Sequence, residues 1–99
     1  MTYKVTEDGN IATIFLDGEI DMDKTEAAKE IIFPHIDSGK EVHLNLSNVQ
    51  YMDSSGISVL IESHQKALEK GSKMIVKDVS KSVLKVIMMA KLEQILNLE

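Results

Sequence analysis

The spacing of the apolar residues changes between residues 41 and 68, and this change constrains the fold most strongly. Residues 41–47 alternate with a period of two, with Val42, Leu44 and Leu46 on one side, as expected for a strand with one apolar face. From residue 57 the apolar residues recur every three or four positions, which predicts a helix that Gly71 ends. The positions expected to face inward are Ile57, Leu60, Ile61, His64, Ala67 and Leu68. A strand that leads directly into a helix favours an α/β fold.

The first 21 residues predict a β-hairpin. Residues 2–7 alternate weakly and residues 11–16 are apolar and β-prone, and Asp8-Gly9 lies between them. An Asp-Gly step between two such runs is a strong hairpin signal, so the two strands are expected to be antiparallel. Residues 17–21 are interpreted as the connection to the next element.

Two further helices and one strand are expected. Asp21 or Asp23 can cap a helix that Ser38-Gly39 ends, although Pro34 inside it should kink or shorten it. Its apolar stripe is Ala28, Ile31, Ile32, His35 and Ile36. Residues 74–76 read as a short buried strand, and Ser80 is expected to cap a last helix. Val83, Leu84, Ile87 and Met88 are expected to face inward there, and an apolar tail of Leu92, Ile95, Leu96 and Leu98 is expected to pack back onto the fold.

The resulting order is β-β-α-β-α-β-α. It predicts a four-stranded mixed sheet in which the first strand is antiparallel and the other three are parallel through right-handed crossovers. Helices should cover mainly one face, with the final helix at the side. A chain of 99 residues is too short for two stable cores, so residues 1–99 are expected to form one domain.

Composition disfavours several classes of function. The formal net charge is −5, all 11 basic residues are Lys, and they form no cluster, which argues against nucleic-acid binding. The chain has no Cys, and its three His are too dispersed for a metal site. No run approaches the ~20 apolar residues that span a bilayer, and the N-terminus lacks the apolar run of a signal peptide. A cytoplasmic protein that does not bind membranes is expected.

The segment Asp53-Ser54-Ser55-Gly56 holds the candidate functional residues. It follows a parallel strand and opens a helix, predicted to start within about two residues of Ser54. Binding sites of open α/β sheets gather at the carboxyl ends of strands, and a helix N-terminus accommodates phosphate. Helix capping alone also explains Asp and Ser at these positions.

Catalysis and cofactor binding have little support in the sequence. No Gly-x-Ser-x-Gly elbow is present, no His forms a motif with Ser54 or Ser55, and there is no Gly-rich loop of the P-loop type. Asp21-Met22-Asp23 is explained more simply by capping than by a metal or a phosphoaspartate. We therefore expect a protein that is not an enzyme and needs no cofactor or metal.

Over essentially all 99 residues the chain resembles the STAS domain, named from sulfate transporters and anti-sigma factor antagonists. Gly18-Glu19-Ile20-Asp21 resembles the family's motif after its second strand. Leu44–Ser47 together with Tyr51–Ile57 resembles its third strand and phosphorylation loop, and Gly71–Val76 resembles its last strand. Asp-Ser-Ser-Gly in this setting is typical of the stand-alone bacterial antagonists. Two positions depart from the pattern: Pro34 is unusual, and Ser58 stands where many antagonists carry Gly.

The resemblance implies a regulatory cycle. The unphosphorylated antagonist would bind an anti-sigma factor that is also a serine kinase, and thereby free a sigma factor. The kinase would phosphorylate Ser54, with Ser55 as the alternative acceptor, and a serine phosphatase would reset the protein. Asp21, Asp53, Ser54, Ser55 and Gly56 would form the partner-binding loop of a monomer.

Two alternatives stay open. The chain could be a STAS scaffold or adaptor in another signalling, secretion or transport assembly, with no sigma-factor output. It could also be a small-molecule sensor, since some STAS relatives bind nucleotides, although the missing phosphate loop argues against tight nucleotide binding.

Overall fold

The computed structural model describes residues 3–99. Within these residues, five strands, three α-helices and two 3₁₀ turns follow one another. They are β1 (Lys4–Asp8), β2 (Ile11–Ile20), η1 (Met22–Lys24), α1 (Thr25–Asp37), β3 (Glu41–Met52), α2 (Ser54–Glu69), β4 (Met74–Lys77), α3 (Lys81–Met89), η2 (Leu92–Gln94) and β5 (Asn97–Leu98).

The sheet is mixed, and its strands lie in chain order from β1 to β5. The β1–β2 pair is antiparallel, whereas the β2–β3, β3–β4 and β4–β5 pairs are parallel. This confirms the predicted α/β fold, the hairpin and the parallel strands; of the predicted first strand, Thr2 lies outside the described residues. The predicted number of strands was wrong, because Asn97 and Leu98 add a short fifth strand beside β4.

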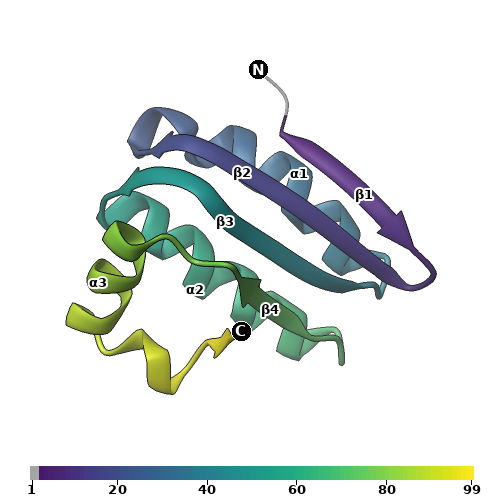
Figure 1. Cartoon of the computed structure of the whole chain (residues 1–99). Coiled ribbons are helices and arrows are strands. Elements are labelled where there is room, and N and C mark those ends of the chain that lie inside the picture. The colour runs from purple at the N-terminus through teal and green to yellow at the C-terminus, as the bar shows by residue number, and fades with distance from the viewer. Residues whose placement is uncertain (1–2) are drawn as a thin grey trace.

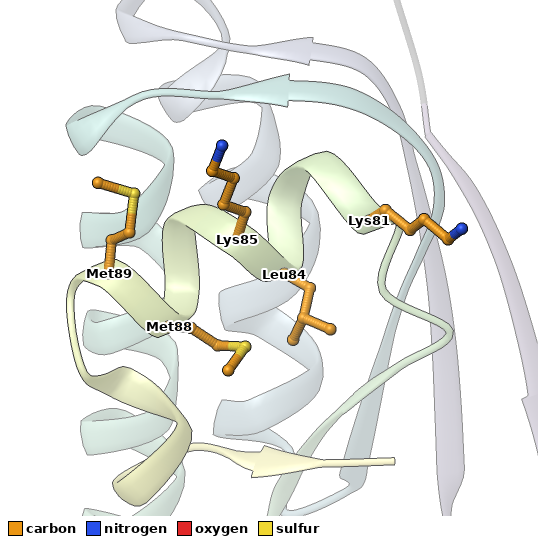
Figure 2. Close-up of a pocket in the computed structure, with 5 residues that line it drawn as sticks. All are labelled: Lys81, Leu84, Lys85, Met88 and Met89. Carbon is orange, nitrogen blue, oxygen red and sulfur yellow. The ribbon is translucent and has the colours of Figure 1, made fainter.

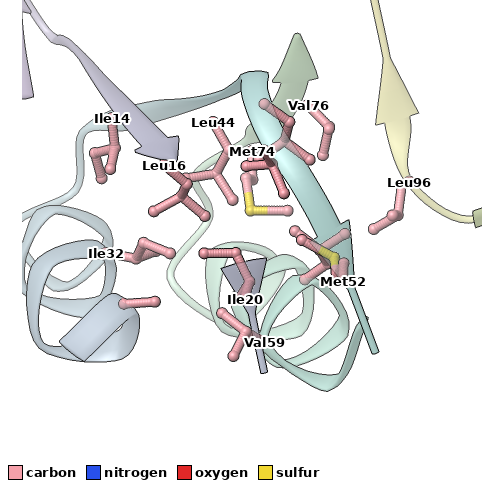
Figure 3. Close-up of a cluster of buried hydrophobic side chains, with 14 of the residues drawn as sticks. Ile14, Leu16, Ile20, Ile32, Leu44, Met52, Val59, Met74, Val76 and Leu96 are labelled. Atoms are coloured by element: carbon pink, nitrogen blue, oxygen red, sulfur yellow. The ribbon is translucent and has the colours of Figure 1, made fainter. Parts of the chain in front are cut away.

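Two helices cover one face of the sheet. Figure 1 shows α1 and α2 side by side behind the strands, with α3 near the far end of β3. The alternating strand residues point into the core between sheet and helices: Ala12, Ile14 and Leu16 from β2, and Val42, Leu44 and Leu46 from β3, are all buried. In Figure 3 side chains from β2, β3 and β4 meet Ile32 of α1 and Val59 of α2.

The buried stripe of α2 differs in part from the predicted one. Helix α2 begins at Ser54 as predicted, Ile57, Leu60 and Ala67 are buried, and Ile61 is half-buried. Leu68, however, is 64% exposed, so that prediction was wrong. The stripe instead passes through Val59 and Ser63, which are both buried. Ser63, a small polar residue, therefore occupies a core position. For this reason the buried face of α2 differs from the face that the apolar residues alone predict.

The predicted end of α1 at Ser38-Gly39 is confirmed, whereas the ends of two strands differ from prediction. Pro34 does not shorten α1, which continues to Asp37 with Ala28, Ile32 and Ile36 buried. Strand β2 does not stop at Leu16 but continues to Ile20 through two register shifts against β3. Gly18 lies at the second shift with a φ of +73°, a conformation that glycine adopts without steric cost. Residues 17–20, interpreted as a connection, are thus strand, and β3 likewise extends to Met52.

The C-terminal part packs back onto the fold, as predicted. Val83 and Ile87 of α3 are buried, as are Leu92 and Leu96 of the tail. Met88 does not face inward as predicted but is 54% exposed. Ile95 is exposed as well. Among residues 3–99, no helix is both long enough and apolar enough to cross a bilayer.

Candidate functional site at the carboxyl ends of two parallel strands

The predicted loop residues come together where β2 and β3 end. Ile20 pairs with Met52 as the last register position of these parallel strands. Asp21 and Asp53 directly follow that pair, so the two carboxylates start from adjacent strand ends. The backbone N–H of Asp53 donates to the carbonyl oxygen of Ile20 at 3.4 Å, which ties the two ends together. The structure thus joins two segments 32 positions apart in the sequence, as expected from the parallel strands.

Both aspartates cap the helical turn that follows them. Asp53 Oδ1 accepts hydrogen bonds from the backbone N–H groups of Ser55 at 2.9 Å and Gly56 at 3.2 Å. Asp21 Oδ1 accepts from the backbone N–H of Asp23 at 3.0 Å, at the start of η1. Each Asp has an extended backbone, as N-cap residues do. Of the two caps that the sequence allows before α1, the structure uses Asp21, which caps η1 directly ahead of that helix.

The two serines of the motif differ in accessibility. Ser54 is the first residue of α2 and is exposed, whereas Ser55 is half-buried. The carbonyl oxygen of Ser54 accepts a hydrogen bond from Ser58 Oγ, one turn further along, at 3.0 Å. Gly56 is buried, and it lies where α2 passes closest to the ends of β2 and β3. The motif therefore presents one exposed serine, Ser54, next to Gly56, which packs tightly against the ends of β2 and β3.

The last part of β3 is held on its other side by α3. Pairing with β4 ends at Asn45, so the later residues of β3 lack a strand neighbour there. Ser80 Oγ donates to the carbonyl oxygen of Val49 at 2.7 Å, and Ser82 Oγ donates to that of Gln50 at 3.1 Å. Ser80 does occupy the predicted N-cap position, but its hydroxyl bonds to β3 and not to α3. Sequence reasoning missed this role, because the alternating pattern of β3 ends at Ser47 and does not show that the strand continues to Met52, past the end of β4.

The surroundings of the loop are acidic and partly apolar. Met22 is 74% exposed, Tyr51 is also exposed, and each lies within two residues of a capping Asp. Burial, and then the negative charges of Asp17 and Asp21, raise the pKa of the Tyr3 phenol above its ordinary value. Tyr3 therefore stays protonated and neutral at physiological pH and adds no negative charge to that of the carboxylates.

None of the three histidines, all of which lie within residues 3–99, is placed to activate Ser54. His43 Nε2 lies 2.6 Å from Glu41 Oε2, and His35 Nδ1 lies 2.8 Å from the carbonyl oxygen of Ile31. His64 is on α2, but ten residues beyond Ser54, which is about 15 Å along a helix axis. Such a separation is too large for a nucleophile and its general base.

A sequence model of the STAS domain matches residues 2–99 of the chain. The chain belongs to the STAS domain family. Its similarity to characterised members is distant: the anti-sigma-B factor antagonist of Bacillus subtilis (strain 168) is 22% identical over 94 residues, which cover 95% of this chain and 86% of that protein.

Solved structures of STAS proteins share the fold. A putative anti-sigma factor antagonist from Thermotoga maritima superposes with a TM-score of 0.88 at 17% identity, covering 97% of this chain and 84% of the other. The anti-sigma factor antagonist SpoIIAA in its unphosphorylated form gives 0.82 at 21% identity, covering 99% and 88%. SpoIIAA of Bacillus in its phosphorylated form gives 0.76 at 20% identity, covering 99% and 91%.

Proposed function

We propose that this STAS protein is an anti-sigma factor antagonist whose partner binding is switched off by phosphorylation of Ser54. The observation that carries the proposal is the exposed position of Ser54 as the first residue of α2, directly after the capping Asp53. In the proposed cycle the unphosphorylated chain binds an anti-sigma factor that is also a serine kinase, and a serine phosphatase restores it. The chain is then a substrate and a switch and not an enzyme.

The exposure of the two serines favours Ser54 as the acceptor. A kinase must reach the hydroxyl and align it with the γ-phosphate of ATP, so an exposed side chain at the helix start is the better substrate. Ser55 is half-buried, and its backbone N–H is already bonded to Asp53. Phosphorylating Ser55 would place a charged group where the helix starts to pack.

The electrostatics explain why phosphorylation would release a partner. A phosphate adds roughly −1.5 to −2 charges at neutral pH. Asp53 already accepts the N–H groups of Ser55 and Gly56, so these donors are not free for the phosphate. Asp21 follows the neighbouring strand end, so a docked partner would bury the new charge beside two carboxylates. Losing about 3 kcal/mol of binding free energy weakens a complex more than 100-fold.

The fold itself should tolerate the phosphate. The N-terminus of α2 has the positive end of the helix dipole, and Ser54 lies on the solvent side of it. The phosphorylated chain should therefore stay folded while it loses its partner, as a reversible switch requires. The two SpoIIAA structures, named for the unphosphorylated and phosphorylated forms, share one fold with this chain and agree with this expectation.

A pull-down from native extract tests the proposal. Ser54→Ala bait should retain an anti-sigma factor with a kinase domain, because it binds but cannot be phosphorylated, whereas Ser54→Asp should retain much less. Ser58→Ala, an exposed serine one turn away, is the matched control and should behave as wild type. Equal recovery of the kinase with the Ala and Asp variants would contradict the switch. Recovery of a transport or secretion complex in place of the kinase would identify the chain as a STAS adaptor. Retention of labelled GTP or ATP by the purified chain would identify it as a nucleotide sensor.

A further inference from the structure

The outer face of α3 has an apolar hollow whose lining residues take no part in the Ser54 site. Its volume is about 410 Å³, and it is lined by Lys81, Leu84, Lys85, Met88 and Met89. Met88 and Met89 are 54% and 75% exposed, although α3 also contributes Val83 and Ile87 to the core on its opposite side. The helix is thus apolar on two faces, and the core covers only one of them.

The hollow has the shape of a helix-packing groove. Lys81, Lys85 and Met89 form one row at spacings of four residues, and Leu84 and Met88 form the adjacent row. Figure 2 shows Leu84 and Met88 extending to one side of the helix and Lys85 and Met89 to the other. A groove between two such rows accepts a row of side chains from a second α-helix crossing at about −50°. The shape therefore indicates a helical occupant.

The charge around the groove indicates the chemistry of that occupant. Residues 79–92 include Lys81, Lys85 and Lys91 and no Asp or Glu, although the whole chain has 16 acidic and 11 basic residues. Within residues 3–99, the ion pairs that the structure forms use other lysines, such as Lys29 with Glu62 and Lys66 with Asp37. The two lysines of the groove are therefore available to carboxylates of a partner.

We propose that this face of α3 is a docking site for an amphipathic α-helix of another protein. That helix lays an apolar row between Leu84 and Lys85 and carries Asp or Glu opposite Lys81 and Lys85. The site is separate from Ser54 and its occupation does not depend on the phosphorylation of that residue.

Two other occupants fit the observations less well. If two copies of the chain paired through this face about a two-fold axis, the antiparallel α3 helices would bring Lys85 against Lys85. An anionic membrane would attract the lysines but repel a chain of net charge −5.

Photo-crosslinking in the native cell tests this proposal. The photoreactive residue p-benzoylphenylalanine replaces Met88 in the full chain, and the matched control carries it in place of Leu68, an apolar residue on α2 that is somewhat more exposed. A product is expected at position 88 and not at position 68, and peptide mapping should place it in an acidic amphipathic helix of another protein. A crosslink to the same chain, to phospholipid, or to a segment without acidic residues overturns the proposal, as does the absence of a product specific to position 88.

Titration with a synthetic peptide of the mapped segment then tests the role of the charges. Lys81→Glu with Lys85→Glu should weaken binding about tenfold, because two ion pairs at the rim become repulsive. Changing the opposing acidic residues of the peptide to Lys should restore binding to this variant. Unchanged affinity of the charge-reversed variant, with its thermal unfolding equal to wild type, overturns the proposal. Neither experiment depends on Ser54, so their outcome is independent of the proposed phosphorylation switch.

Discussion

A Cβ atom at Gly56 would lie 2.6 Å from the carbonyl oxygen of Ile20. It would also overlap with Cγ of Met52, at the end of the neighbouring strand. Only a residue without a side chain lets α2 start so close to the ends of β2 and β3. This contact fixes how far the start of α2, and with it Ser54, lies from the sheet. The position of the proposed phosphorylation site therefore depends on Gly56.

Replacing Gly56 should therefore destabilise the protein. Gly56→Ala should lower the free energy of unfolding by about 1–3 kcal/mol, because the Met52 side chain can turn away but the Ile20 carbonyl is fixed in the sheet. Urea denaturation provides the measurement. Ser58→Ala, a surface change in the same turn of α2, should stay within about 0.5 kcal/mol of wild type. If Gly56→Ala is as stable as Ser58→Ala, the close packing described here is wrong.

Two leucines of α2 should respond very differently to truncation. Leu60 is fully buried and Leu68 is 64% exposed. Leu60→Ala should cost about 2–5 kcal/mol of unfolding free energy, as removal of a core leucine does. Leu68→Ala should cost less than about 0.5 kcal/mol. Equal losses in thermal or urea denaturation would show that the helix is rotated relative to the position described.

The capping role of Asp53 can be separated from its charge. Asp53→Ala removes the acceptor of the Ser55 and Gly56 N–H groups and should cost about 1 kcal/mol of stability. Asp53→Asn keeps a capping oxygen and should cost only a few tenths of that. Comparison of the three unfolding curves checks this. If Asp53→Asn lowers the free energy of unfolding as much as Asp53→Ala does, the negative charge of Asp53, and not its hydrogen bonds, stabilises the start of α2.

Tyr3 should contribute to the loss of stability at alkaline pH. Burial and the charges of Asp17 and Asp21 raise the pKa of its phenol above 10.0. Below about pH 10 the Tyr3 phenol is neutral in both the folded and the unfolded chain, so it does not change the free energy of unfolding with pH. Above about pH 10 the phenol loses its proton in the unfolded chain first, so the free energy of unfolding falls until the pH passes the raised pKa of the folded state. Tyr3→Phe should reduce this fall in unfolding free energy above about pH 10. A pH slope in Tyr3→Phe identical to that of wild type would contradict the shift.

The sequence predicts the layers and the motif of this protein because its patterns are local. Strand alternation at Val42, Leu44 and Leu46, and the change to helical spacing after Gly56, define the core elements. The meeting of Asp21 and Asp53 follows from parallel strands, since the carboxyl ends of such strands share one edge.

The remaining features depend on contacts distant in the sequence. The buried Ser63 has no hydrophobic signal, and Gly18 reads as a turn although it lies at a register shift within β2. The two-residue β5 is too short to leave a pattern. The exposure of Met88 and the hydrogen bond from Ser82 to β3 both depend on where α3 packs, which its own spacing does not determine.

Site-specific mass spectrometry tests the central claim most directly. Wild type, Ser54→Ala and Ser55→Ala are each incubated with ATP and the kinase recovered on the Ser54→Ala bait. We predict one phosphate on Ser54 in wild type and in Ser55→Ala, and none in Ser54→Ala. Phosphate retained in Ser54→Ala and lost in Ser55→Ala would contradict the assignment of the acceptor, and no phosphate on any form, with a kinase shown to be active, would contradict the switch itself.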